Sequence, residues 1–129
     1  MNTKDKVERA KDDGYCCSET IMKLVLEDLC IEDDRLIDAM GAFCGGMGAG
    51  QVCGALSALV SSMCVALGRV SVKKELRADI VEWFKCEHGA LDCTTLIKGD
   101  AANKKTICPG IIESAYDHAH GLLVDRGLV

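Results

Sequence analysis

The sequence has little proline, no basic cluster and no alternation of apolar and polar residues. Pro109 is the only proline among 129 residues, and no linker or low-complexity tract interrupts the chain, so we expect one domain over residues 1–129. Apolar residues recur at spacings of three and four and not at two, which excludes a strand-rich fold. The sequence therefore predicts an all-α bundle that can bury an apolar core without covalent staples.

The charge balance argues against nucleic-acid binding. The chain carries 15 Lys and Arg residues against 20 Asp and Glu residues, a formal net charge of −5. It has no Lys/Arg cluster and no stripe of aromatic and basic residues, so nucleic-acid binding is not expected. The acidic segments at 27–28 and 32–34 are typical of solvated surface, and a less favoured interpretation is that they dock a basic redox partner protein.

No segment resembles a signal or a membrane span. The polar residues 1–6 are not followed by an apolar signal region, which predicts a cytoplasmic protein with reduced thiols. The longest apolar stretch, residues 52–67, is short for a span and contains glycine and serine. We expect it to form a buried helix, and we expect no membrane partner.

The apolar periodicity predicts five to six helices. Thr3 is the expected cap of the first helix, and Cys108 with Pro109 is the expected start of the last, because proline suits a first helical turn. A glycine-rich loop at 44–50 should break the chain before the central helix. The expected helices cover residues 3–13, about 17–29, about 34–43, 52–67, 71–89, a short turn after residue 93, and residues from 108 onward. Short connections between them indicate an up-and-down bundle.

Cysteine is the residue that the sequence has in excess. Nine cysteines are too many for an ordinary composition and too scattered for a zinc finger. An odd number of thiols without a secretory signal favours a metal or redox protein over a disulfide scaffold. The nine are Cys16, Cys17, Cys30, Cys44, Cys53, Cys64, Cys86, Cys93 and Cys108.

The positions of several of these cysteines in the expected helices indicate whether they belong to a site or to the core. Cys53 and Cys64 lie on one expected helix, and a rise of 1.5 Å per residue separates them by roughly 16 Å, so one metal centre cannot use both. Cys64 is best interpreted as a small hydrophobe in the core, and Cys30 and Cys86 are interpreted in the same way. Cys44 borders the glycine-rich loop and stays open as a neighbour or substitute at a site.

Four cysteines share an expected position at the start of a helix or helical turn: Cys17, Cys53, Cys93 and Cys108. Unpaired amide hydrogens and the positive end of the helix dipole stabilise a thiolate there, and the thiolate is both nucleophile and metal ligand. Four thiolates that meet at one end of a bundle would suit an iron–sulfur cluster or zinc. Cys16 would take the place of Cys17 if the helix began one residue earlier.

The motifs around these four residues resemble a family of small bacterial and archaeal redox proteins named after their C…GCAxxG…C…C pattern. The resemblance runs from Gly14 to about Ala115. One position departs from it, since Ala58 replaces the final glycine of the central motif and puts tight helix packing there in doubt. The matching segments are Gly14-Tyr15-Cys16-Cys17, with Cys17 aligned, Gly45-Gly46-Met47-Gly48, Cys53-Gly54-Ala55-Leu56-Ser57-Ala58, Phe84…Gly89…Cys93, and Cys108.

The resemblance implies redox-active cysteines that ligate a [2Fe–2S] or [4Fe–4S] cluster for electron transfer, with no substrate chemistry of its own. A related module accompanies haems in split-Soret cytochromes, and this resemblance leaves a homodimer open. This chain has no Cys-x-x-Cys-His segment, so haem is not expected. Two alternatives stay open. One is thiol–disulfide or sensor chemistry that pairs Cys53 with Cys93 or Cys108, and the other is a structural zinc site.

Overall fold

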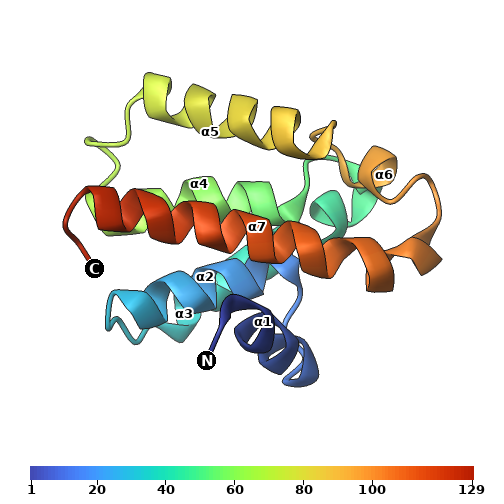
Figure 1. Ribbon diagram of the computed structural model, residues 1–129, viewed down its shortest axis with the longest axis horizontal. Helices are drawn as coiled ribbons and strands as arrows, with labels where there is room; N and C mark the ends of the chain where they lie inside the picture. The colour runs from blue at the N-terminus through green and yellow to red at the C-terminus, as the bar shows by residue number, and fades with distance from the viewer.

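The computed structural model describes residues 1–129 and consists of helices joined by turns, with no strand beyond one isolated β-bridge (Figure 1). This confirms the all-α fold. The helices are α1 (Thr3–Asp12), α2 (Cys17–Asp28), α3 (Asp34–Met40), α4 (Gly54–Leu67), α5 (Lys74–His88), α6 (Cys93–Leu96) and α7 (Lys104–Asp125). Short 3₁₀ turns at Gly41–Phe43 and Ala101–Asn103 follow α3 and precede α7.

Helices α2, α4 and α7 pack against one another and form the centre of the molecule. Seven of the 14 residues of α4 are buried and none is exposed, as its nearly continuous apolar sequence predicts. Ala58 on this helix is completely buried, so the methyl group that departs from the family pattern is accommodated in the core. Helices α1 and α3 flank α2 on one side, and α5 covers α4 on the other (Figure 1).

Side-chain caps fix several helix starts. Asn2, and not Thr3 as expected, caps α1, since its side-chain oxygen accepts a hydrogen bond of 2.8 Å from the backbone N–H of Asp5. Asp33 caps α3, and its side chain accepts a hydrogen bond of 3.1 Å from the backbone N–H of Arg35. Asp92 caps α6 by accepting bonds from the backbone N–H and the hydroxyl of Thr95.

The expected start of the last helix was wrong. Helix α7 begins at Lys104 and not at Cys108, because the Asp100 side chain accepts a hydrogen bond from the N–H of Ala102 and opens a 3₁₀ turn that runs directly into α7. Pro109 therefore lies in the second turn of the helix, where its missing N–H leaves the carbonyl of Lys105 without its helical donor.

The glycine-rich segment forms a tight left-handed turn before α4, as its composition predicts. Gly45 and Gly46 have φ values of 65° and 66°, a region that glycine enters without steric cost. Met47 adopts φ 62° in the same turn and is exposed. No helix of the molecule is both long enough and apolar enough to cross a membrane.

Candidate functional site

The starts of α2, α4, α6 and α7 all lie in the right half of the molecule as drawn in Figure 1. Cys17 is the first residue of α2, Cys53 is the N-cap of α4 and Cys93 is the first residue of α6. Their predicted positions at helix starts are therefore confirmed. Cys108 is the exception, because it lies in the second turn of α7.

A close approach of α4 to α2 brings Cys17 next to the start of α4. A methyl group built on Gly54 would lie 2.8 Å from the Cys17 Sγ and 2.7 Å from the carbonyl oxygen of Phe43. A real Cβ does not come this near to another heavy atom, so only glycine permits this contact at the first residue of the helix. Gly54 therefore forms part of the cradle for the Cys17 sulfur.

A short backbone bridge brings Cys53 next to Cys93. Val52 and Asp92 form an isolated antiparallel pair. The N–H of Cys53 donates to the carbonyl of Leu91 at 2.8 Å, and the N–H of Cys93 donates to the carbonyl of Gln51 at 2.7 Å. Both thiols are nearly buried, with 8 % of each residue exposed. The bridge thus holds two cysteines that lie far apart in the sequence on neighbouring backbone segments.

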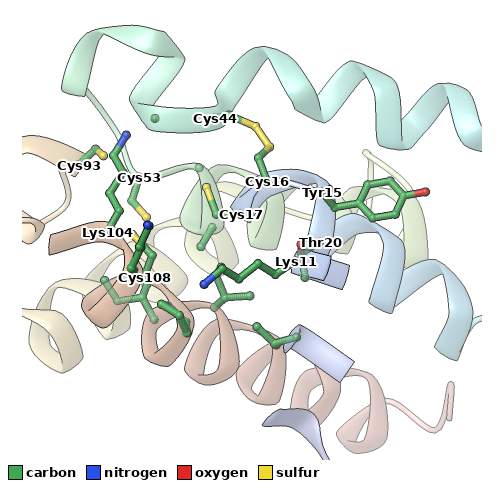
Figure 2. Close-up of a pocket in the computed structure, with 18 residues that line it drawn as sticks. Lys11, Tyr15, Cys16, Cys17, Thr20, Cys44, Cys53, Cys93, Lys104 and Cys108 are labelled. Carbon is green, nitrogen blue, oxygen red and sulfur yellow. A yellow bond between two sulfur atoms is a disulfide. The ribbon is translucent and has the colours of Figure 1, made fainter. Parts of the chain in front are cut away.

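A cavity of about 300 Å³ collects the predicted site residues. Its lining includes all four predicted cysteines, Cys17, Cys53, Cys93 and Cys108, and Figure 2 shows them reaching it from four different helices. Three lysines also line it, Lys11, Lys104 and Lys105, and the Lys104 ammonium comes within 3.7 Å of a Cβ built on Gly45. The cavity therefore combines soft sulfur donors with positive charge.

Burial dominates the acidity of these thiols in the metal-free protein. It raises the pKa of Cys53 to about 11, although the N–H groups of Ala55 and Leu56 act in the opposite direction. It also raises the pKa of Cys17, against the N–H groups of Gly45 and Ser18. The expectation that helix starts would leave these sulfurs as thiolates is therefore wrong for both residues.

The thiols also interact electrostatically with one another. Burial raises the pKa of Cys108, the charges of Cys17 and Cys93 raise it further, and Lys104 lowers it. Cys17 and Cys108 act on Cys53 in the same way. Four mutually repelling thiolates are stable together only when a cation or a positively charged cluster binds them.

The structure contains one disulfide, between Cys16 and Cys44, and both residues line the same cavity. The sequence offered no Cys-x-x-Cys signal for this pair, and its partners are 28 residues apart. Cys44 is thus a neighbour of the four thiols, as the sequence left open, and Cys16 and Cys17 have different environments although they are adjacent.

Two of the three cysteines expected in the core are on the surface, so that expectation was wrong. Cys30 follows the end of α2 with φ 57° and is exposed. Cys86 is also exposed, and its Sγ lies 3.5 Å from a carboxylate oxygen of Glu82 one helical turn away. Cys64 is half-buried and packs against the core, in agreement with its interpretation as a small hydrophobe.

The distances between the sulfurs of Cys17, Cys53, Cys93 and Cys108, the four-cysteine set, limit which metal centre this set could bind. Among all groups of three metal-capable side chains, only Cys16, Glu19 and Cys44 have donor atoms within 4.8 Å of one another. No three of the four site sulfurs are therefore that close. A single zinc ion with bonds near 2.3 Å would hold all its sulfurs roughly 3.8 Å apart in a tetrahedron, whereas an iron–sulfur cluster distributes its four cysteine ligands over two or four iron atoms, so no three of the sulfurs need to lie that close together.

Fold and site together define a class: a helical protein in which several helix starts bring thiols and a disulfide to one cavity. Comparison with protein families then identifies the family. The chain belongs to the family described as "Putative redox-active protein (C_GCAxxG_C_C)", whose model matches residues 15–122. The match confirms the resemblance seen in the sequence. Searches of curated proteins and of solved structures found no match.

Proposed function

We propose that this redox-active family member is an electron-transfer protein in which Cys17, Cys53, Cys93 and Cys108 bind an iron–sulfur cluster. The observation that carries the proposal is that these four thiols, which come from four helices, line one cavity. The set is chemically suited to iron, because cysteine thiolates are the usual ligands of [2Fe–2S] and [4Fe–4S] clusters. A bound cluster would supply one-electron transfer, which the side chains of the chain cannot perform.

The residues around the cavity fit such a group. The backbone N–H groups of Gly45 and Ser18 donate to the Cys17 sulfur, and that of Ala55 donates to the Cys53 sulfur. Hydrogen bonds of this kind orient thiolate ligands and help to set the potential of a cluster. Lys11 and Lys104 at the cavity would offset the negative charge of four thiolates. Near-complete burial of Cys53 and Cys93 keeps water away from their sulfurs.

The two alternatives have less support. A structural zinc ion would require sulfurs closer together than those of the four-cysteine set. A disulfide between Cys53 and Cys93 or Cys108 is not formed in the structure, whose disulfide joins Cys16 and Cys44 instead. Wide spacing of the four sulfurs and the separate disulfide both favour a cluster at the four-cysteine set.

Anaerobic purification followed by iron and sulfide analysis tests the proposal. The wild-type protein should be coloured, with a visible charge-transfer band, and should contain iron and acid-labile sulfide. Cys53→Ser should lose bound iron almost completely, because it removes one of four ligands from a buried position. Cys64→Ser is the matched control, since Cys64 lies on the same helix but does not line the cavity.

Equal iron content in the Cys53→Ser and Cys64→Ser proteins would reject the four-cysteine assignment. A colourless wild-type protein that binds zinc stoichiometrically would instead support the structural alternative. Thiol titration of the same samples separates a zinc site from free cysteines, because a bound metal protects its ligands from alkylation.

A further inference from the structure

We propose that Cys16 and Cys44 form a reversible dithiol–disulfide couple that exchanges with an external dithiol or disulfide at the cavity. The inference does not rest on the iron–sulfur proposal, because it concerns other cysteines and is tested in the metal-free protein. It assigns the chain a two-electron thiol chemistry beside the four-cysteine set. Three features of the pair, its access, its surroundings and the fold's independence of it, support this role.

The pair is accessible and well placed for both redox states. Both residues are half-buried and line the open cavity, so a thiol can reach their sulfurs. Their Cα atoms are 6.1 Å apart, a separation at which a disulfide forms without movement of the backbone. The pair joins the start of α2 to the glycine-rich turn (Figure 2).

Ser18 provides a partner for the reduced state. Its hydroxyl is completely buried and donates its only hydrogen to the carbonyl of Met40 at 2.6 Å. The same oxygen lies 3.4 Å from the Cys16 Sγ and 3.2 Å from the Cys44 Sγ. Because a hydroxyl oxygen has two lone pairs, it can accept an S–H hydrogen bond from each thiol once the disulfide is reduced. A disulfide has no hydrogen to donate, so these contacts favour the dithiol.

The fold does not depend on this covalent link. The same two segments are already joined by the Ser18–Met40 hydrogen bond and by the N–H of Gly45, which donates to the Cys17 sulfur. A core of 23 buried residues holds the molecule together, and a chain of this length does not need a staple. Reduction can therefore occur within the folded protein.

The exchange is balanced in atoms and electrons. A thiolate of the external dithiol attacks one sulfur of the Cys16–Cys44 bond, that bond breaks, and the other cysteine leaves as a thiolate. The second thiol of the reagent then attacks the mixed disulfide and releases the protein. The external dithiol is oxidised to a disulfide, and the protein pair gains two electrons and two protons. The reverse reaction reduces an external disulfide.

The test places metal-free full-length protein in buffers of reduced and oxidised dithiothreitol, followed by alkylation and peptide mass spectrometry. Cys44 should change from oxidised to reduced across the series while the far-ultraviolet circular dichroism stays constant. Dithiothreitol should reduce the bond at least about tenfold faster than it reduces oxidised glutathione. In the Cys16→Ser protein, Cys44 should form a mixed disulfide with glutathione.

Several results would overturn the inference: Cys44 reduced in every buffer, reduction only together with unfolding, or reduction no faster than that of oxidised glutathione.

A matched pair of variants tests the part played by Ser18. Ser18→Ala should shift the equilibrium toward the disulfide by roughly threefold to tenfold, because it removes acceptors for weak S–H donors. Ser62→Ala should leave it unchanged, since Ser62 is an equally buried serine that donates to the carbonyl of Leu59 at 2.9 Å and makes no hydrogen bond with a cysteine. Equal shifts in both variants, or none in either, would contradict the assignment.

Discussion

At the scale of single residues, Gly54 decides how closely the first turn of α4 approaches the Cys17 sulfur. Gly54→Ala should displace Cys17 or the Phe43 carbonyl, because the new Cβ would lie within 2.8 Å of both the Sγ and that oxygen. We expect a loss of iron binding and a destabilisation of about 1–3 kcal/mol, the usual cost of overpacking a tight contact. Iron analysis and chemical denaturation measure the two effects.

The control for that variant is Gly121→Ala, a second glycine within a helix. No atom lies within 4 Å of a Cβ built on Gly121, and alanine is the better helix former by about 0.5–1 kcal/mol. This protein should bind the proposed cluster as the wild type does and become slightly more stable. If both variants bind iron normally, the close contact at Gly54 has no part in the site.

The sequence indicates which cysteines begin helices, but it does not indicate the pKa of their thiols. An amide-rich helix start contributes about 0.3–1 kcal/mol to an exposed charge, whereas full burial can shift a pKa by 3–5 units in the opposite direction. Cys53 sits at a helix start and is also nearly buried, so burial prevails and its pKa rises to about 11. The sequence shows which residue begins a helix, but the depth of its side chain depends on the helices packed around it.

At the scale of helices, α5 contacts α7 through stacked rings. The Trp83 and His118 rings lie 3.8 Å apart at an angle of 8°. Burial lowers the pKa of His118 below 6.5, opposed by the charge of Glu87. The folded protein thus favours neutral His118, so this contribution to stability is present above pH 6.5 and is lost as the pH falls through the lower folded pKa.

Fluorescence can follow this titration, because Trp83 is the only tryptophan. We expect Trp83 emission to fall as His118 becomes protonated, with a midpoint below pH 6.5. His118→Asn should remove the step, and His120→Asn should keep it, since His120 lies instead against Asp28. A step that survives in His118→Asn would assign the titration to His88, whose ring centroid is 6.1 Å from that of Trp83.

The start of α7 explains why the sequence alone does not place Cys108 correctly in its helix. Glycine stops and apolar periodicity located α2, α4 and α5 well, because these signals are local. The start of α7 depends on Asp100, whose capping bond to Ala102 opens the preceding turn, and a proline further along the helix obscured that signal. Cys108 still reaches the cavity from the second turn of α7, because residues of α7 from Lys104 to Ile112 line it.

At the scale of the whole molecule, the fold class and the four thiols at the cavity were predictable, but the contacts that join them were not. Spacing and composition indicated which cysteines share a chemical role. The Val52–Asp92 bridge and the Cys16–Cys44 disulfide are contacts between distant segments, and no periodicity or local motif encodes such pairings. They become visible only when α2, α4, α6 and the glycine-rich turn are packed together.

Because the four thiols come from helices across most of the chain, a bound cluster should stabilise the whole molecule. It binds the folded arrangement, and the unfolded chain does not hold four sulfurs together, so binding adds to the free energy of unfolding. For a chain of this size we expect anaerobic reconstitution with iron and sulfide to raise the Tm by at least about 5 °C. Far-ultraviolet circular dichroism measures the change independently of any redox activity.

Cys93→Ser should abolish the increase in Tm, because it removes the only ligand on α6. Cys86→Ser should retain the increase, because Cys86 is an exposed cysteine on α5. An increase of equal size in both variants would mean that iron stabilises the protein from another position.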